Sequence, residues 1–403
     1  MNNSDIITLN EKKKRCLYLK YRRMGKTEEM VSPLGFGMMR PPLVTGDQGS
    51  PIFGAGQIDE KASVSMLRKA IDMGINYVDT AYNYQNGGSE ILTGKALLDG
   101  YREKVFVATK SPVFMYSGEG DFDRFLNEQL ERLHTDYIDF YMLHGLSADT
   151  WRNLALKYGA PEKLLAAKKA GKVRHIGFSF HDSFDSFRKI VDYWDEWEFC
   201  QIQLNYIDEN SQAGIKGLKY ASERDLGVAI MEPLRGGYLV NVPDNVRNEI
   251  VTSGKTPVEL ALDYLWDMPE VSVVLSGMGS TSQAEENIEY AERAYAGMFT
   301  ELDRKAVAGA VKQFASFDNI PCTGCNYCSV CPQGIGISSH FSAYNEYQTH
   351  KDIERGRKYY KYTVPLFGAY ATECVKCGAC ESICPQHLNI TELLPKITEM
   401  FSE

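Results

Sequence analysis

Short apolar stretches alternate with longer amphipathic stretches from about residue 34 to residue 291. The apolar stretches are rich in Val, Ile, Tyr and Phe, which is typical of buried β-strands. Eight stretches fit this description: 34–38, 76–80, 105–109, 137–143, 173–179, 199–205, 227–231 and 271–276. The segments between them repeat apolar residues at helical spacing. Several begin with a proline, as at Pro161 and Pro257, or end before a glycine, as at Gly171.

This alternation of strand and helix predicts a parallel sheet, because each helix returns the chain to the start of the next strand. Eight repeats over roughly 260 residues predict an α/β fold of the closed (β/α)8 TIM-barrel type. The alternative is an open, doubly wound sheet, which would place a glycine-rich phosphate loop after the first strand. The first strand leads instead into MMRPPLV (38–44), so the barrel is favoured.

The repeating pattern ends near residue 300. Beyond it the chain contains a charged helical segment, two runs of closely spaced cysteines and a Tyr-rich helical connector between the runs. We therefore expect three parts: an N-terminal tail and the start of a hairpin over 1–23, the barrel over 24–300, and a small α-rich domain that carries the cysteine runs over 301–403.

Composition and charge narrow the class of protein further. The 403 residues include 53 acidic and 44 basic side chains, for a net charge of −9. This acidic balance disfavours a nucleic-acid partner, and we interpret the basic stretch 12–23 as a solvated edge. No apolar run is long enough to cross a membrane, and no apolar export segment follows Arg22-Arg23. A cytoplasmic location without a membrane partner is therefore expected.

Eight of the ten cysteines fall between residues 322 and 384. Clustered cysteines in a chain without an export signal indicate metal ligation rather than disulfides. The first run has the spacing C-x2-C-x2-C-x2-C-P, and the second has C-x2-C-x2-C-x3-C-P. The runs consist of Cys322, Cys325, Cys328 and Cys331, and of Cys374, Cys377, Cys380 and Cys384. Cys16 and Cys200 lie outside them and are interpreted as ordinary thiols.

In (β/α)8 barrels, chemistry gathers at the C-terminal ends of the strands. The second, third and fourth predicted strands end at or beside an ionisable residue: Asp79, Lys110 and His144. An Asp and a Lys buried there would form an ion pair, because each is costly to bury alone. The ammonium would lower the pKa of a nearby phenol, Tyr84 or Tyr82, which could then donate a proton to a carbonyl oxygen. The alternative is a purely structural polar network.

Residues 20–295, roughly, resemble the aldo-keto reductase family in eight segments. In order they are VSPLGFGMMR, NYVDTAYNYQNGGSE, VFVATKSP, YMLHG, VRHIGFSF, QIQLNYID, MEPLRGGYL and VVLSGMGSTSQAEENI. The resemblance implies a catalytic tetrad that reduces a carbonyl by hydride transfer from NAD(P)H. In this tetrad Tyr84 would be the general acid and base, and Lys110 would lower its pKa. Asp79 would hold Lys110, and His144 would orient the substrate.

The resemblance also implies a cofactor site. Ser179 and Gln203 fall where the family binds the nicotinamide carboxamide, and Met231 falls where many members stack an aromatic ring. The other implied cofactor residues are Leu234, Gly236, Ser276, Gly277, Gln283, Glu286 and Asn287. The usual basic partners of the 2′-phosphate fall on Gly277 and Gln283, which carry no charge. A preference for NADPH over NADH is therefore expected to be weak or reversed.

The two cysteine runs resemble a ferredoxin-type domain with two [4Fe–4S] clusters. By that resemblance, three cysteines of each run and the fourth of the other run hold one cluster. One set would be Cys322, Cys325, Cys328 and Cys384, and the other Cys374, Cys377, Cys380 and Cys331. A pair of zinc sites is the alternative, because paired C-x2-C knuckles also bind zinc.

Together these features predict an NAD(P)(H)-dependent oxidoreductase that acts on a small carbonyl or alcohol and carries two [4Fe–4S] clusters. The alternative is an electron-transfer protein in which the cysteine domain is the working part and the barrel is a docking or nucleotide-binding scaffold. Hydride transfer moves two electrons and a cluster moves one. The clusters are therefore structural, or serve an external electron carrier, or work with a flavin, for which no motif is apparent. We also expect the cysteine domain to close part of the barrel mouth.

Overall fold

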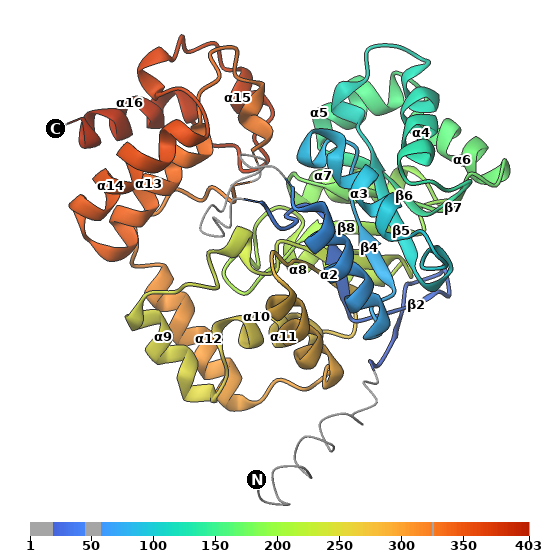
Figure 1. Ribbon diagram of the computed structural model, residues 1–403, viewed down its shortest axis with the longest axis horizontal. Coiled ribbons are helices and arrows are strands. Elements are labelled where there is room, and N and C mark those ends of the chain that lie inside the picture. Colours follow the sequence, from blue (N-terminus) through green and yellow to red (C-terminus); the bar gives the residue numbers. More distant parts are fainter. Residues whose placement is uncertain (1–18, 45–57, 325, 403) are drawn as a thin grey trace, which may run out of the picture.

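The computed structural model describes residues 19–44, 58–324 and 326–402. Its centre is a closed barrel of eight parallel strands in the order β10-β3-β4-β5-β6-β7-β8-β9 (Figure 1). The strands are β3 (Leu34–Gly37), β4 (Tyr77–Asp79), β5 (Phe106–Ser111), β6 (Ile138–Leu146), β7 (Val173–Phe180), β8 (Phe199–Gln203), β9 (Gly227–Met231) and β10 (Val273–Gly277). All eight predicted strands are present and the barrel is confirmed.

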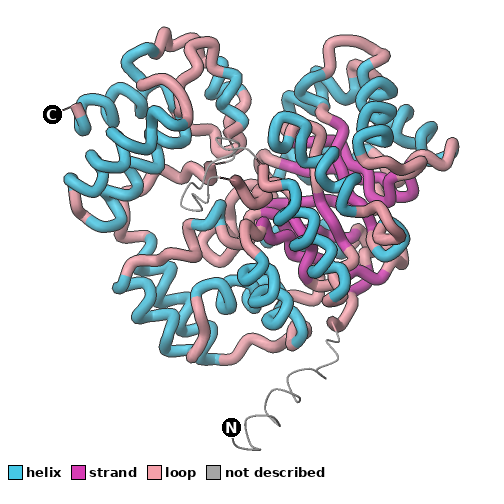
Figure 2. The backbone as a smooth tube through the Cα atoms, viewed as in Figure 1, coloured by secondary structure: helices cyan, strands magenta, loops and turns pink. Residues whose placement is uncertain are grey.

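Helices cover the outside of the barrel (Figure 2). They are α2 (Glu60–Asp72), α3 (Gly88–Ala96), α4 (Asp121–Arg132), α5 (Ala148–Thr150), α6 (Ala160–Lys169), α7 (Phe184–Tyr193), α8 (Gly214–Ser222), α9 (Asp244–Ile250), α10 (Pro257–Trp266) and α11 (Thr281–Glu292). Amphipathic spacing explains their placement: α4 buries Phe122, Phe125 and Leu126 on one face and exposes charged side chains on the other. Thr256 begins α10 with a capping box, and Pro257 occupies its first turn.

A short hairpin lies at the N-terminal end of the barrel. Strand β1 (Arg22–Arg23) pairs antiparallel with β2 (Met30–Val31). Met24 and Val31 are fully buried and pack with Tyr77, Phe140 and Phe199 in the interior of the barrel. The hairpin therefore fills the end of the barrel opposite the C-terminal ends of the strands.

The C-terminal part contains α13 (Ile337–His350), α14 (Ile353–Thr363), α15 (Ala379–Ser382) and α16 (Ile390–Phe401). These helices share a core of their own, which includes Phe341, Leu394 and Ile397. Helix α12 (Glu301–Phe314) instead packs beside α9 and buries Ala306 and Ala310 in the core of the barrel. By packing, α12 therefore lies against the helices around the barrel.

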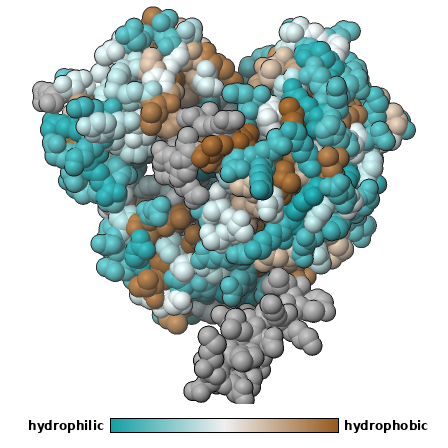
Figure 3. All heavy atoms as spheres, in the orientation of Figure 1, coloured by the Kyte–Doolittle hydropathy of each residue, from teal (hydrophilic) through white to brown (hydrophobic). Residues whose placement is uncertain are grey.

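The C-terminal helices and the barrel form two lobes with a notch between them, and the visible surface of both is mainly hydrophilic (Figure 3). Side chains and backbone of the C-terminal part contact the C-terminal ends of β6 and β8 and the loop after β9. Among the helices in the described residues, none is long and apolar enough to cross a membrane. Cys16 and Cys325 lie outside the described residues.

Candidate active site and cysteine centres

The register of the strands brings Asp79, Lys110 and His144 together. Asp79 on β4 is paired with Ala108 on β5, and Lys110 follows two positions later. Lys110 is paired with Met142 on β6, and His144 again follows two positions later. Because side chains alternate between the faces of a strand, the three side chains share the interior face and step around the barrel mouth.

Asp79 and Lys110 form a buried ion pair. Lys110 Nζ lies 2.7 Å from Asp79 Oδ1 and also donates to the backbone oxygen of Thr80 at 2.8 Å. Asp79 is 3% exposed and Lys110 is 1% exposed. Burial lowers the pKa of Lys110, while the charge of Asp79 acts in the opposite direction. The ammonium is therefore held in a fixed position but is poorly solvated, so its charge acts strongly on its neighbours.

Tyr84 faces this ammonium, whereas Tyr82 does not. Lys110 Nζ lies 4.9 Å from the centre of the Tyr84 ring, and Tyr84 begins the short 3-10 helix η2 (Tyr84–Gly87). The Tyr82 hydroxyl donates to Glu128 Oε2 at 2.6 Å, and its ring packs edge-on against Phe125. The residues alone left Tyr82 and Tyr84 as competing candidates, and Tyr84 is the one of the two whose ring lies beside the ammonium.

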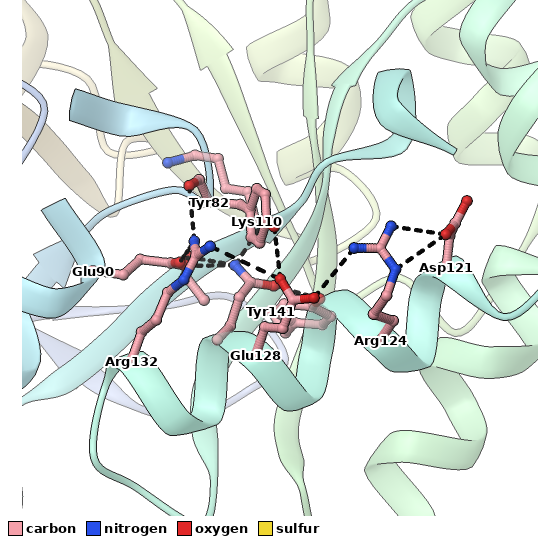
Figure 4. Close-up of polar contacts among 10 residues, drawn as sticks. Tyr82, Glu90, Lys110, Asp121, Arg124, Glu128, Arg132 and Tyr141 are labelled. Atoms are coloured by element: carbon pink, nitrogen blue, oxygen red, sulfur yellow. Dashed lines mark hydrogen bonds and ion pairs between the residues drawn. The ribbon is translucent and has the colours of Figure 1, made fainter. Parts of the chain in front are cut away.

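A second buried network supports Lys110 from the side of α3 and α4 (Figure 4). Glu90 accepts hydrogen bonds from Thr109 Oγ1 at 2.6 Å and Gln129 Nε2 at 2.5 Å, and it pairs with Arg132 at 3.1 Å. Gln129 also donates to the backbone oxygen of Lys110 at 3.1 Å. Burial raises the pKa of Glu90, and these donors oppose that rise. The network fixes the backbone from which the Lys110 side chain projects.

His144 lies in β6 where the register shifts between Leu143 and Leu146. Its Nε2 lies 2.8 Å from the hydroxyl of Tyr327, which belongs to the first cysteine run. Burial is the main cause that lowers the pKa of His144 well below its usual value, and the charge of Lys110 adds to it. His144 is therefore neutral at ordinary pH and carries one N–H donor.

The residues that the resemblance assigns to the nicotinamide carboxamide lie at the C-terminal ends of β7 and β8, and both are hydrogen-bonded. Ser179 Oγ accepts from the backbone N–H of Gly145 at 2.8 Å. Gln203 Oε1 accepts from Gln212 Nε2 at 2.9 Å and from Gln386 Nε2 at 3.1 Å. A buried hydroxyl and a buried amide are the donor and acceptor set that a carboxamide needs, so the chemistry of these residues fits that group.

The loop after β9 lies against the cysteine domain. Its 3-10 turn is η6 (Arg235–Gly237). Leu234 precedes this turn, and Gly236 lies in it with a φ of 64°. A Cβ at Gly236 would collide with the backbone oxygen of Thr323, so only glycine fits there. Arg40 donates to the backbone oxygen of Gly236 at 2.7 Å.

The remaining implied cofactor residues lie around the ends of β9, β10 and the start of α11. Met231 is half-buried, and Gly277, Gln283 and Glu286 are exposed. Ser276 Oγ accepts from Asn287 Nδ2 at 3.1 Å, so these two are linked inside the fold. Gln283 Oε1 accepts from the backbone N–H of Gly279 at 2.8 Å, and Glu286 accepts from Tyr290 at 2.6 Å.

Cysteines of the two runs meet at one cavity. Cys322 and Cys328 of the first run and Cys384 of the second line it, together with Asn326 and Pro385. A cavity lined by thiols from both runs fits the resident group of a ferredoxin-type domain. Among the described residues, no three His, Cys, Asp or Glu side chains converge at the spacing of a single metal ion.

The second cysteine set lies nearer the surface. Cys380 is buried and lies within electrostatic reach of Cys331 of the first run. Cys374 is half-buried, and Cys377 is exposed. The described cysteines are all thiols rather than disulfides.

The sequence did not predict which residues of the C-terminal part contact the barrel. Tyr327 contacts His144, and Gln386 contacts Gln203, each across 183 positions. Gln212 also donates to the backbone oxygen of Pro385 at 3.4 Å. The prolines after the two runs are a local signal of cluster binding, but no local signal marks which neighbours would reach the barrel.

Comparisons with known proteins agree with this architecture. A model of the Aldo/keto reductase family matches residues 33–305, and a model of the 4Fe-4S dicluster domain matches residues 321–388. L-galactose dehydrogenase of Arabidopsis thaliana is 29% identical over 293 residues, covering 67% of this chain and 87% of that protein. NADH-specific methylglyoxal reductase of Escherichia coli is 24% identical over 314 residues, covering 66% of this chain and 91% of that protein.

A solved aldo-keto reductase from Klebsiella pneumoniae in complex with NADPH has the same barrel fold. It superposes with a TM-score of 0.56 at 23% identity and covers 71% of this chain and 95% of that one. The family match covers more than half of the sequence and includes every strand of the barrel. The chain therefore belongs to the aldo/keto reductase family and carries a C-terminal 4Fe-4S dicluster domain.

Proposed function

We propose that the barrel reduces a small carbonyl compound, or oxidises the matching alcohol, with NAD(P)(H), and that Tyr84 is the general acid and base. The observation that carries this proposal is the buried ammonium of Lys110, which lies 2.7 Å from Asp79 Oδ1 and 4.9 Å from the Tyr84 ring. A cation fixed beside a phenol stabilises the phenolate left after proton donation.

Each residue of the tetrad then has a defined task. Tyr84 donates its proton to the carbonyl oxygen, and Lys110 stabilises the resulting phenolate. Asp79 holds Lys110 in place. His144, neutral because of its burial, donates an N–H to the same oxygen and orients the substrate.

Ser179 and Gln203 would hold the carboxamide of a nicotinamide cofactor, which would supply or accept the hydride. Gly277 and Gln283 offer no charge to a 2′-phosphate, so NADH and NADPH are expected to bind with similar affinity, or NADH more tightly. The related Escherichia coli enzyme is named as NADH-specific, which is in line with this expectation. Equilibrium titration with both nucleotides measures the ratio of the two Kd values, and a 100-fold tighter binding of NADPH would contradict it.

We also propose that the cysteines hold two [4Fe–4S] clusters in the interleaved arrangement. Cys322, Cys328 and Cys384, which line one cavity, would hold one cluster with Cys325. Cys331, Cys374, Cys377 and Cys380 would hold the other. Protein purified without oxygen should contain about eight iron atoms and about eight acid-labile sulfides per chain. Two equivalents of zinc without sulfide would overturn this assignment.

Replacing the two neighbouring tyrosines tests the catalytic assignment. Tyr84→Phe removes the proposed proton donor and should lower kcat for aldehyde reduction by about 10²- to 10⁴-fold. Tyr82→Phe removes a hydroxyl that is bonded to Glu128 and should leave kcat nearly unchanged. The measurement is the loss of NADH or NADPH absorbance over a panel of aldehydes. Turnover that does not depend on Tyr84 would defeat the proposal.

The second candidate, electron transfer to or from an external carrier, has one observation in its favour. Cys377, a ligand of one proposed cluster, is exposed. Electron transfer slows steeply with distance, so an exposed cluster is the point where a redox partner would dock. Electron paramagnetic resonance can show whether a reduced ferredoxin reduces the clusters. Reduction would support the electron-transfer role. If no carrier reduces the clusters, their role is structural.

A further inference from the structure

An aromatic side chain from the cysteine domain reaches the catalytic site. Tyr327 begins the 3-10 helix η8 (Tyr327–Val330) and lies between Cys325 and Cys328 in the sequence. Its hydroxyl lies 2.8 Å from Nε2 of His144, and the two ring centres are 5.9 Å apart. Nε2 of His144 is thus engaged by a residue from outside the barrel.

Two barrel residues complete an aromatic cover with Tyr327. Phe114, in the 3-10 helix η4 (Val113–Met115), has its ring centre 6.0 Å from that of Tyr327 and 5.4 Å from that of His144. His181, which follows β7, lies 6.0 Å from Tyr327 by the same measure. Under this cover His144 is 1% exposed and Tyr84 is 8% exposed.

The cover is anchored on the barrel at several points around the mouth. Gln386 donates to Gln203 at 3.1 Å, and Gln212 donates to the backbone oxygen of Pro385 at 3.4 Å. The backbone of Thr323 packs on Gly236. Contacts this widely spaced hold the segment that carries Tyr327 against the mouth.

A carbonyl oxygen that accepts an N–H from Nε2 of His144 must approach the place where the Tyr327 hydroxyl lies. The rest of the substrate must then pass the rings of Phe114 and Tyr327, which contact each other over His144. We propose that Tyr327 is a specificity-determining residue, supplied by the iron–sulfur domain, which restricts the barrel site to small carbonyl compounds. This inference rests on the proposed carbonyl reductase function.

The test compares a small and a bulky aldehyde, glycolaldehyde and 2-naphthaldehyde, on the iron-loaded protein with NADH or NADPH. Tyr327→Ala should raise the ratio of kcat/KM for the bulky aldehyde to kcat/KM for the small one by at least about 10-fold. Phe114→Ala opens the same space from the barrel side and should change the ratio in the same direction. Tyr327→Phe keeps the ring and should keep the ratio.

Tyr362→Ala is the matched control, because Tyr362 is a 65% exposed tyrosine of the same domain. Its ratio of kcat/KM for the bulky aldehyde to kcat/KM for the small one should equal that of the wild type. Iron and sulfide are measured for every variant, because Tyr327 adjoins Cys328. If Tyr327→Ala loses iron, Phe114→Ala decides the question.

An unchanged ratio in Phe114→Ala and in iron-loaded Tyr327→Ala would overturn the inference while leaving the proposed function intact. Reduction of both aldehydes that persists in Tyr84→Phe would instead overturn the proposed function, and the inference with it.

Discussion

At the scale of single residues, the site depends on burial. Asp79 and Lys110 are nearly inaccessible to water, so the energy of their interaction is set by a medium of low effective dielectric constant. Breaking such a pair leaves an unpaired buried charge, which costs about 3–5 kcal/mol. In the proposed mechanism, the burial that makes the pair costly to break also lets the charge of Lys110 act strongly on Tyr84.

Replacing Lys110 with Met keeps the length of the side chain and removes its charge. We expect kcat to fall by about 10²-fold or more, because the phenolate of Tyr84 loses its stabilising cation. The alkaline limb of the pH profile should move to higher pH, since the pKa of Tyr84 rises. The pH dependence of kcat measures both effects, and an unchanged alkaline limb would exclude Lys110 as the group that tunes Tyr84.

His181 should make the protein less stable in acid. Burial lowers the pKa of His181 to about 4, whereas an unfolded chain has a His pKa of about 6.5. Between these values the unfolded state binds a proton that the folded state does not, so stability falls as pH falls below about 6.5. The contribution of His181 to this loss should be about 2 kcal/mol at pH 5 relative to pH 7.5.

Urea unfolding of the anaerobic protein at both pH values measures this difference in the free energy of unfolding. His181→Gln should show a smaller pH dependence than the wild type. An identical dependence in the two proteins would assign the acid sensitivity to other groups.

At the scale of elements, the strands were predictable and the supporting network was not. The eight strands are buried runs bounded by turn residues. The sequence alone was therefore enough to place Asp79, Lys110 and His144 at or beside the ends of three strands. Gln129 stands at the helical spacing of Phe122, Phe125 and Leu126 on the buried face of α4, and Glu90 lies in α3, which is largely buried. Spacing therefore predicts the burial of Gln129. The hydrogen bonds that join the two side chains to Thr109 and to each other follow from how the helices pack on the barrel, which the local pattern does not encode.

Disrupting this network should be costly. Glu90→Ala leaves Arg132 and Gln129 without their buried acceptor, so we expect a loss of about 3–5 kcal/mol in the free energy of unfolding. Glu285→Gln breaks the exposed ion pair with Lys69 on the surface and should cost less than about 1 kcal/mol. Denaturant unfolding of the two variants measures both losses in the free energy of unfolding. Equal losses would show that the buried network stabilises the fold no more than an exposed ion pair does.

At the scale of the whole molecule, the two domains share one site. The sequence showed a barrel and a cysteine domain in series, and it suggested that the second covers part of the mouth. It could not show that Tyr327 meets His144 or that Gln386 meets Gln203, because these pairs are 183 positions apart and arise from the docking of two folded parts. The docking places the cavity lined by Cys322, Cys328 and Cys384 next to the barrel mouth.

This arrangement raises the question of how electrons reach the substrate. A hydride carries two electrons directly from the nicotinamide to carbon, whereas a path through clusters would deliver single electrons and take its hydrogen from water. The fate of a labelled hydrogen distinguishes the two routes.

The most direct measurement is therefore the reduction of an aldehyde with NADH deuterated at C4 of the nicotinamide on the transferred face, followed by mass spectrometry of the alcohol. The account predicts one deuterium on the carbinol carbon in the wild type and about 10²- to 10⁴-fold slower formation of this product in Tyr84→Phe. An alcohol whose new carbon-bound hydrogen comes from water, formed at the same rate in Tyr84→Phe, would contradict it.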